Sequence, residues 1–155
     1  MNNILAIDPG ASGGWAVGAY DRGEIILRLV EPMPEGMSAQ IDRLRAIRDA
    51  WRPIVAIVER GGLWRPGDHP NAACKFARHC GALEAALYAL DIATEQAAAS
   101  VWQRSCGPLP KDRAARKRAI RELMARRFPM VRPTLRTADA LAILCWALAR
   151  NVTTG

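Results

Sequence analysis

The chain has 155 residues, half of them hydrophobic, and it carries 22 Lys and Arg against 15 Asp and Glu. This length predicts one domain spanning 1–155 with a sizeable core, and the apolar content excludes a disordered chain. The formal net charge of +7 favours an anionic partner, with nucleic acid as the leading candidate. Charge alone is equally compatible with a basic protein that has no such partner.

Neither a targeting signal nor a membrane span is expected. The N-terminus enters a predicted strand without a basic stretch, which argues against a signal peptide. The longest apolar run, residues 140–149, is too short to cross a bilayer, so we expect a cytoplasmic protein without a membrane partner. The four cysteines form no Cys-x-x-Cys pair, which favours reduced thiols over a disulfide framework or a zinc site.

Three strands joined by short turns are predicted at the start of the chain, at residues 3–8, 14–19 and 24–30. Their spacing is typical of an antiparallel meander. A helical pattern over 38–51 follows, and Ser38 is its expected N-cap.

A fourth strand is predicted at residues 54–59, which are almost entirely apolar and therefore suit a strand covered on both faces. The later elements are predicted as a loop at 60–70, a helix at 71–90, a short strand at 91–95 and helices at 111–127 and 136–149. This order predicts an α/β fold with a mixed sheet, in which parallel strands extend three antiparallel ones and helices lie on both sides.

Three carboxylates stand at the edges of these apolar elements. Asp8 ends the first predicted strand, Glu59 ends the fourth, and Asp139 begins the last apolar segment. If the first and fourth strands are parallel neighbours, Asp8 and Glu59 emerge side by side, and Asp139 joins them from the first turn of a helix, where the helix dipole favours an acid. Such close like charges need a cation, so the pattern predicts a Mg²⁺ or Mn²⁺ site suited to phosphodiester hydrolysis.

Each acid also has a simpler explanation. Asp8 before Pro9 and Gly10 is typical of a turn-forming aspartate, and Asp139 could serve only as a charge at a helix start. Glu59 is harder to explain in this way, because Glu is a poor choice at the end of an apolar strand. The three acids in this element order favour a catalytic site.

A basic segment precedes the last helix. Residues 111–132 hold nine Lys or Arg and only two acids. Apolar residues recur there at helical spacing, so an amphipathic helix with a basic exposed face is predicted, and the imbalance of sign favours nucleic acid over a merely solvated surface. The candidate DNA-binding residues of this segment are Lys111, Arg113, Lys117, Arg118 and Arg121.

The loop after Glu59 adds further candidate DNA contacts at Arg60, Trp64 and Arg65. An aromatic side chain on a basic loop can stack on an unpaired base, and a hydrophobic plug on the domain surface is an equally good explanation. Ser12, in the turn after the first strand, is a further candidate contact.

In order and spacing these segments resemble the RuvC-type Holliday-junction resolvases, of the ribonuclease-H-like fold, and in particular phage-type members. The resemblance spans nearly the whole chain. The segments that carry it are Ile7-Asp8-Pro9-Gly10 with Ser12-Gly13-Gly14, Ile57-Val58-Glu59, Phe76–Leu87, Val101-Trp102-Gln103 with Leu109-Pro110-Lys111, Lys117 with Arg121–Pro129, and Ala138–Ile143.

The resemblance implies a Mg²⁺-dependent endonuclease of DNA recombination and repair, with Mn²⁺ as a possible substitute. It would make paired nicks in four-way or other branched DNA, as a homodimer formed through the helix at about 71–90. Asp8 would serve both ions, and Glu59 and Asp139 would each complete one. Lys117 would offset the charge that develops at the scissile phosphate.

Two positions depart from the family's pattern. Arg136 stands where bacterial members usually carry a further acid or a histidine. Gly62 stands where an aromatic wedge is common, so Trp64 is only a candidate substitute. Arg136 keeps open a catalytically silent module that binds branched DNA. The acid and glycines after the first strand also keep open an actin-like or sugar-kinase-like ATPase, although such proteins usually need two domains of this kind.

Overall fold

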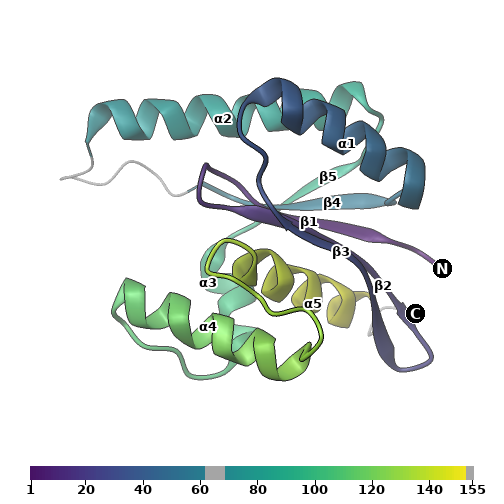
Figure 1. The fold of residues 1–155 in the computed structure, drawn as a ribbon, viewed down its shortest axis with the longest axis vertical. Coiled ribbons are helices and arrows are strands. Elements are labelled where there is room, and N and C mark those ends of the chain that lie inside the picture. The colour runs from purple at the N-terminus through teal and green to yellow at the C-terminus, as the bar shows by residue number, and fades with distance from the viewer. Residues whose placement is uncertain (62–68, 153–155) are drawn as a thin grey trace.

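The computed structural model describes residues 1–61 and 69–152, which form a five-stranded sheet with helices on both faces (Figure 1). The strand order is β3-β2-β1-β4-β5. The strands are β1 (Ile4–Asp8), β2 (Gly14–Asp21), β3 (Glu24–Pro32), β4 (Val55–Glu59) and β5 (Thr94–Ala97). β1, β2 and β3 pair antiparallel, whereas β4 is parallel to both β1 and β5. The predicted mixed sheet is therefore confirmed.

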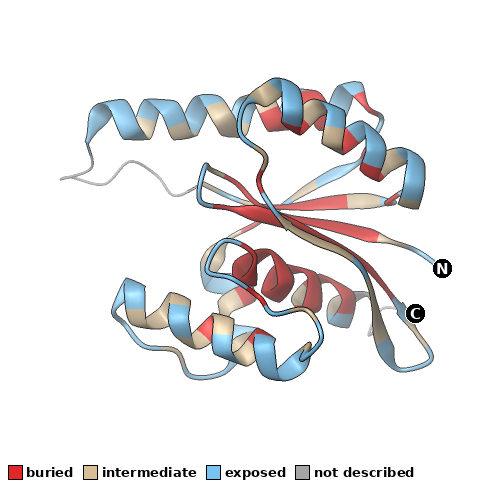
Figure 2. Ribbon diagram, viewed as in Figure 1, coloured by how far each residue is buried: buried red, intermediate tan, exposed pale blue. Residues whose placement is uncertain are grey.

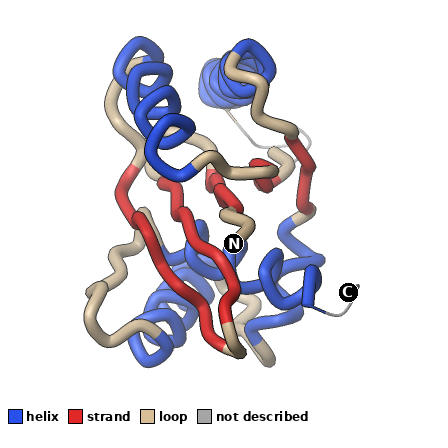
Figure 3. Tube along the Cα trace, turned by 90° about the vertical axis from the view of Figure 1, so that its right-hand side faces the viewer, coloured by secondary structure: helices blue, strands red, loops and turns tan. Residues whose placement is uncertain are grey.

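Helices form a layer on each face of this sheet (Figures 1 and 3). The layer above it in Figure 1 contains α1 and α2, and the layer below contains α3, α4 and α5. The helical segments are α1 (Met37–Trp51), α2 (Pro70–Ala89), α3 (Ala99–Trp102), the 3₁₀ turn η1 (Gln103–Cys106), α4 (Arg113–Arg127) and α5 (Ala138–Val152). In the described part of the chain no helix combines the length and apolar character needed to cross a bilayer.

Alternate residues of the central strands serve the two layers. On β1, Ile4 and Ala6 join the core cluster that contains α5, whereas Leu5 and Ile7 join the cluster that contains α1 and α2. Successive side chains of a strand point to opposite faces, which is why both clusters draw on the same strands. α5 is the most buried of the helices, as its colour in Figure 2 shows.

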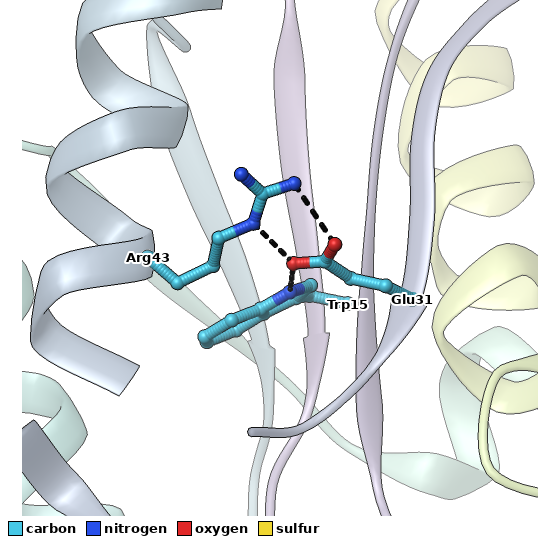
Figure 4. A network of polar contacts seen from close by, with 3 residues as sticks. All are labelled: Trp15, Glu31 and Arg43. Carbon is cyan, nitrogen blue, oxygen red and sulfur yellow. Dashed lines mark hydrogen bonds and ion pairs between the residues drawn. The ribbon is translucent and has the colours of Figure 1, made fainter. Parts of the chain in front are cut away.

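A polar network fixes α1 to the antiparallel side of the sheet (Figure 4). Trp15 and Glu31 are cross-strand partners, and the Trp15 indole Nε1 donates a hydrogen bond of 2.7 Å to Glu31 Oε1. Arg43 of α1 donates from Nε and Nη2 to the two oxygens of Glu31, at 2.5 and 2.9 Å. Because Trp15 also pairs with Ile7, this network supports the end of β1, directly before Asp8.

Several boundaries differ from the sequence-based expectation. α1 begins at Met37 after Gly36, without a side-chain cap, so the prediction of Ser38 as N-cap was wrong. The last strand lies at Thr94–Ala97 instead of 91–95, because α2 continues to Ala89 and the chain then turns through Asp91, whose φ is +54°. The short helical segment formed by α3 and η1 was not predicted at all.

Candidate active site

The sheet register brings Asp8 and Glu59 to the same place. Ile7 pairs with Val58 in the parallel β1–β4 ladder, so the two acids that follow end neighbouring strands at the same edge. Asp8 comes two residues after Ala6 and Glu59 two residues after Ile57, both of which face the α5 layer. The alternation of side chains therefore turns both carboxylates toward α5.

Asp139 joins this edge from α5. It lies in the first turn of the helix, only 6% exposed. Thr137 fixes the turn that leads into the helix, because its hydroxyl accepts a hydrogen bond from the backbone N–H of Thr134 at 3.0 Å. α5 packs directly on β1 and β2, so the start of α5 brings its acid to the end of β1.

The environment of Asp8 strongly disfavours its charge. The residue is 8% exposed, and its pKa is raised from 3.8 to about 8. Burial is the largest cause, followed by repulsion from Glu59 and Asp139, while the positive charges of Lys117 and Arg113 act in the opposite direction. The three predicted acids therefore face one another closely enough to interact.

Glu59 is oriented by a tryptophan. The indole Nε1 of the fully buried Trp102 donates a hydrogen bond of 2.8 Å to Glu59 Oε2. The pKa of Glu59 is raised, mainly by burial, and the Trp102 hydrogen bond counters part of that rise because it favours the ionised form. The hydrogen bond engages one carboxylate oxygen and leaves Oε1 to the site.

Lys117 reaches the acids from α4. Its Nζ lies 3.1 Å from Asp139 Oδ2, and its side chain is only partly exposed. The other oxygen, Asp139 Oδ1, is buried without a hydrogen-bond partner. A buried, unsatisfied carboxylate oxygen is costly, and a cation would satisfy it.

The donor set fits a divalent cation with oxygen ligands, such as Mg²⁺ or Mn²⁺. Three carboxylates converge, one has an unpartnered oxygen, and burial and the acidic neighbours raise the pKa of Asp8, a rise that a bound cation would offset. Within residues 1–61 and 69–152, no three acidic, His or Cys side chains are already drawn together as a cation-binding cluster. A bound cation would therefore pull these carboxylates closer to one another.

The turn after Asp8 requires glycine. A Cβ on Gly13 would lie 1.9 Å from the backbone oxygen of Asp8, and one on Gly14 would lie 2.7 Å from the backbone oxygens of Arg136 and Glu31. No other residue type fits these approaches without moving the backbone. The glycines therefore let the turn, the end of β3 and the segment before α5 close around the acid site.

Arg136 stabilises the same junction. Its Nη2 donates hydrogen bonds to the backbone oxygens of Ala11, at 3.0 Å, and Met33, at 2.9 Å. The guanidinium thus joins the turn after Asp8 to the chain that leaves β3. Arg136 therefore cross-links two loops by hydrogen bonds, a role that the sequence did not suggest.

The candidate DNA-binding residues divide into two groups. Lys117 and Arg113 lie near the acids, since the charge of each lowers the pKa of Asp8 and Glu59. Of the others, Ser12, Arg60, Lys111 and Arg118 are exposed on the surface, and Arg121 is half-buried. Trp64, Arg65 and Gly62 lie outside the described residues.

Trp102 and Arg136 are the site residues that sequence reasoning missed. Trp102 stood in a segment noted only for its resemblance to phage-type resolvases, and Arg136 was noted only as a departure. The sequence offered no signal for the Trp102–Glu59 contact beyond the tryptophan itself, whose indole N–H needs an acceptor once it is buried.

The fold is that of the Holliday junction resolvases. Thermus thermophilus RuvC superposes with a TM-score of 0.64 at 20% identity, covering 98% of this chain and 97% of that one. The Fowlpox virus resolvase, solved with its substrate Holliday junction DNA, gives 0.58 at 12% identity, covering 95% and 99%. The yeast mitochondrial Holliday junction resolvase gives 0.55 at 14% identity, covering 99% and 84%.

No protein-family profile and no curated protein sequence matches the chain. The structural matches nevertheless confirm the resemblance to RuvC-type resolvases that the motifs suggested, at the level of the ribonuclease-H-like fold.

Proposed function

We propose that this protein is a divalent-metal-dependent endonuclease that resolves four-way or other branched DNA junctions by paired phosphodiester hydrolysis. The observation that carries the proposal is the convergence of Asp8, Glu59 and Asp139 on the α5 side of the sheet edge. The fold shared with resolvases supports the choice of branched DNA as the substrate class.

The three acids would hold the cation, Mg²⁺ or Mn²⁺. Asp8 is the most central of them, since its pKa responds to both Glu59 and Asp139. When bound, the metal would activate a water molecule and stabilise the leaving oxygen of the phosphodiester. The unpartnered Oδ1 of Asp139 and the free oxygen of Glu59 are suited to face it.

Lys117 would serve the phosphate. Its ammonium group lies at the acid cluster, where it offsets negative charge. When a scissile phosphate is bound beside Asp139, the same charge is available to the oxygens on which charge develops during cleavage.

Paired nicks require two active sites, and we propose that two copies of the chain associate through α2. Much of the N-terminal half of this helix is exposed, and it extends past the sheet (Figure 2). Near its other end, Tyr88 is 86% exposed. A second copy would cover these residues and place the two acid sites on one junction.

The test compares the protein with its Asp8→Asn variant on a synthetic four-way junction and on a linear duplex, with Mg²⁺ or with a chelator. We expect symmetric nicks on the junction in Mg²⁺ alone, no nicks from the variant, and similar junction affinity for both proteins. The affinity should survive because binding depends mainly on the basic surface.

Three results would contradict the proposal. Junction binding by the wild type without nicks under any metal condition would indicate the catalytically silent module. ATP binding without DNA binding would indicate the ATPase alternative. Equal cutting of junction and duplex would contradict selectivity for branched DNA.

A further inference from the structure

A basic cavity lies near the acid site, and of its charged residues only Lys111 is among the DNA contacts expected from the sequence. Its volume is about 290 Å³, and it opens between the α3–η1 segment and the stretch that leads into α4. Three cations line it, namely Arg104, Lys111 and Arg116, together with the polar side chains of Ser100 and Gln103. No acidic side chain lines the cavity.

The three cations of this cavity have no carboxylate partner in the described part of the chain. Arg104 Nε donates to the backbone oxygen of Ser100 at 2.9 Å, and Arg116 Nη1 donates to that of Lys111 at 3.0 Å. These bonds hold each guanidinium in place through a single nitrogen and leave further N–H donors on both.

The acid nearest in sequence, Asp112, does not neutralise the cavity by an ion pair. Its carboxylate accepts a hydrogen bond of 2.8 Å from the backbone N–H of Ala115 and thereby caps α4. A second cavity, lined by Arg127 and Arg150, differs in this respect, because Arg150 is paired with both oxygens of Glu95. That second cavity thus has a carboxylate pairing one of its two arginines, whereas Arg104, Lys111 and Arg116 form no ion pair within the described part of the chain.

The cavity and the acid site draw on neighbouring residues of two segments. Trp102, which holds Glu59, is directly followed by the cavity residue Gln103. On α4, Lys117 contacts Asp139 while its neighbour Arg116 lines the cavity. A strand of DNA whose phosphate lies at the acids would therefore find further positive charge immediately to one side.

We propose that this cavity binds a backbone phosphate of the DNA strand that passes through the acid site, with Arg104, Lys111 and Arg116 as its ligands. The inference rests on the proposed function and adds a position along the substrate. The lining holds cations and hydrogen-bond donors but no aromatic ring, so it suits a phosphate and gives no platform for stacking a base. Contacts of this kind hold the duplex in register and carry no base specificity.

The test measures junction affinity against salt concentration for an Arg104→Gln/Lys111→Gln double variant. Both side chains are exposed, so the fold should tolerate the change. Each lost phosphate contact lowers the slope of log affinity against log salt by about 0.9. Because the cavity is proposed to hold one phosphate, we expect the slope to fall by about 1 and the affinity at 0.1 M salt to fall about tenfold.

Two controls separate local contact from overall charge. The Arg45→Gln/Arg48→Gln variant removes the same number of charges from α1, on the opposite face of the sheet, and it should keep the wild-type slope. The Arg104→Lys/Lys111→Arg variant keeps both charges in the cavity and should do the same. Equal slopes for the two Gln variants would overturn the inference.

A chemically modified junction locates the contact. Neutral methylphosphonates are placed one at a time at the phosphates near the cut, and each is tested with wild type and with the cavity variant. We expect one or two positions to weaken wild-type binding and to have no effect on the variant. If every position weakens both proteins equally, the cavity does not hold a phosphate of that strand.

The two proposals fail in different ways. If the wild type cuts junctions but the cavity variant keeps the full salt slope, only the cavity inference fails. If the wild type neither binds nor cuts the junction, the proposed function fails and takes this inference with it.

Discussion

Trp102 Nε1 donates a hydrogen bond of 2.8 Å to Glu59 Oε2, and this bond links the α3–α5 side of the core to the acid site. Trp102 is fully buried, so the geometry of the bond is set by core packing. The same bond counters the rise in the pKa of Glu59 that burial causes. Core packing thus controls both the orientation and the ionisation of one acid.

The Trp102→Phe variant should separate catalysis from binding. Loss of the hydrogen bond raises the pKa of Glu59 further, so the rising limb of the pH–rate profile should move to higher pH. A hydrogen bond to a charged group is worth about 1.5–3 kcal/mol, so single-turnover cleavage at neutral pH should fall about tenfold or more, with junction affinity unchanged. Trp146→Phe is the matched control, because Trp146 lies against Arg150, whereas the indole that bonds Glu59 is that of Trp102. Equal profiles for the two variants would contradict a role for the Trp102 hydrogen bond.

The raised pKa of Asp8 predicts how stability depends on pH without metal. Well below pH 3.8, the ordinary pKa of the group, the carboxyl is protonated in the folded and unfolded states alike. As the pH rises from about 4 to 8, the unfolded state ionises first, so folding loses free energy until the folded-state pKa of about 8 is reached. Asp8→Asn removes this loss, so its advantage over wild type should grow by roughly 2 to 4 kcal/mol between pH 5 and pH 8.

Urea unfolding in chelator at several pH values measures this difference. Added Mg²⁺ should stabilise the wild type and narrow the gap at pH 8, since a ligand that binds only the folded state raises its stability. A variant that is no more stable than wild type at pH 8 would show that Asp8 is not held protonated by its surroundings.

Lys117 is predicted to act on the chemical step. In Lys117→Gln the positive charge at Asp139 is lost, and the pKa of Asp8 and Glu59 rises because Lys117 lowers both. Single-turnover cleavage should fall about 100-fold, while junction affinity changes less than about threefold. Arg118→Gln removes an exposed charge at the next position and should show the reverse pattern, with weaker binding and a nearly normal rate at saturating DNA. The role of Lys117 would be refuted by matching losses in the two variants.

Arg136 is predicted to contribute to stability through its two backbone acceptors. Arg136→Ala removes the bonds to Ala11 and Met33, which should cost about 1–3 kcal/mol of unfolding free energy. Arg126→Ala, an exposed position on α4, should cost less than about 0.5 kcal/mol. Chemical denaturation of both variants tests this. If Arg136→Ala loses no more unfolding free energy than Arg126→Ala, the two Arg136 hydrogen bonds do not stabilise the fold.

The sheet and two of its acids were predictable because strand patterns are local. The apolar runs that end in Asp8 and Glu59 show where β1 and β4 stop, and parallel pairing then brings both ends to one edge. Asp139 was predictable for a similar reason, since an acid at the start of an apolar helix suits the first turn.

Contacts between distant segments could not be predicted. Trp102 is 43 residues from Glu59, and nothing in the few residues of α3 and η1 shows a helical period. Arg136 bonds to backbone oxygens more than 100 residues away at Ala11 and Met33, and such acceptors leave no trace in side-chain pattern. The capping pattern also gave a wrong helix start, because α1 begins after Gly36 and Ser38 lies inside the helix.

Cleavage of a supercoiled plasmid that extrudes a cruciform shows whether two acid sites act together on one junction. If two acid sites cut one junction within a single binding event, the first product in Mg²⁺ is linear DNA with symmetric nicks. The Asp8→Asn variant should still bind the cruciform but leave the plasmid uncut. Nicked circles as the lasting product, or no cutting in any divalent metal, would contradict a paired junction-resolving nuclease.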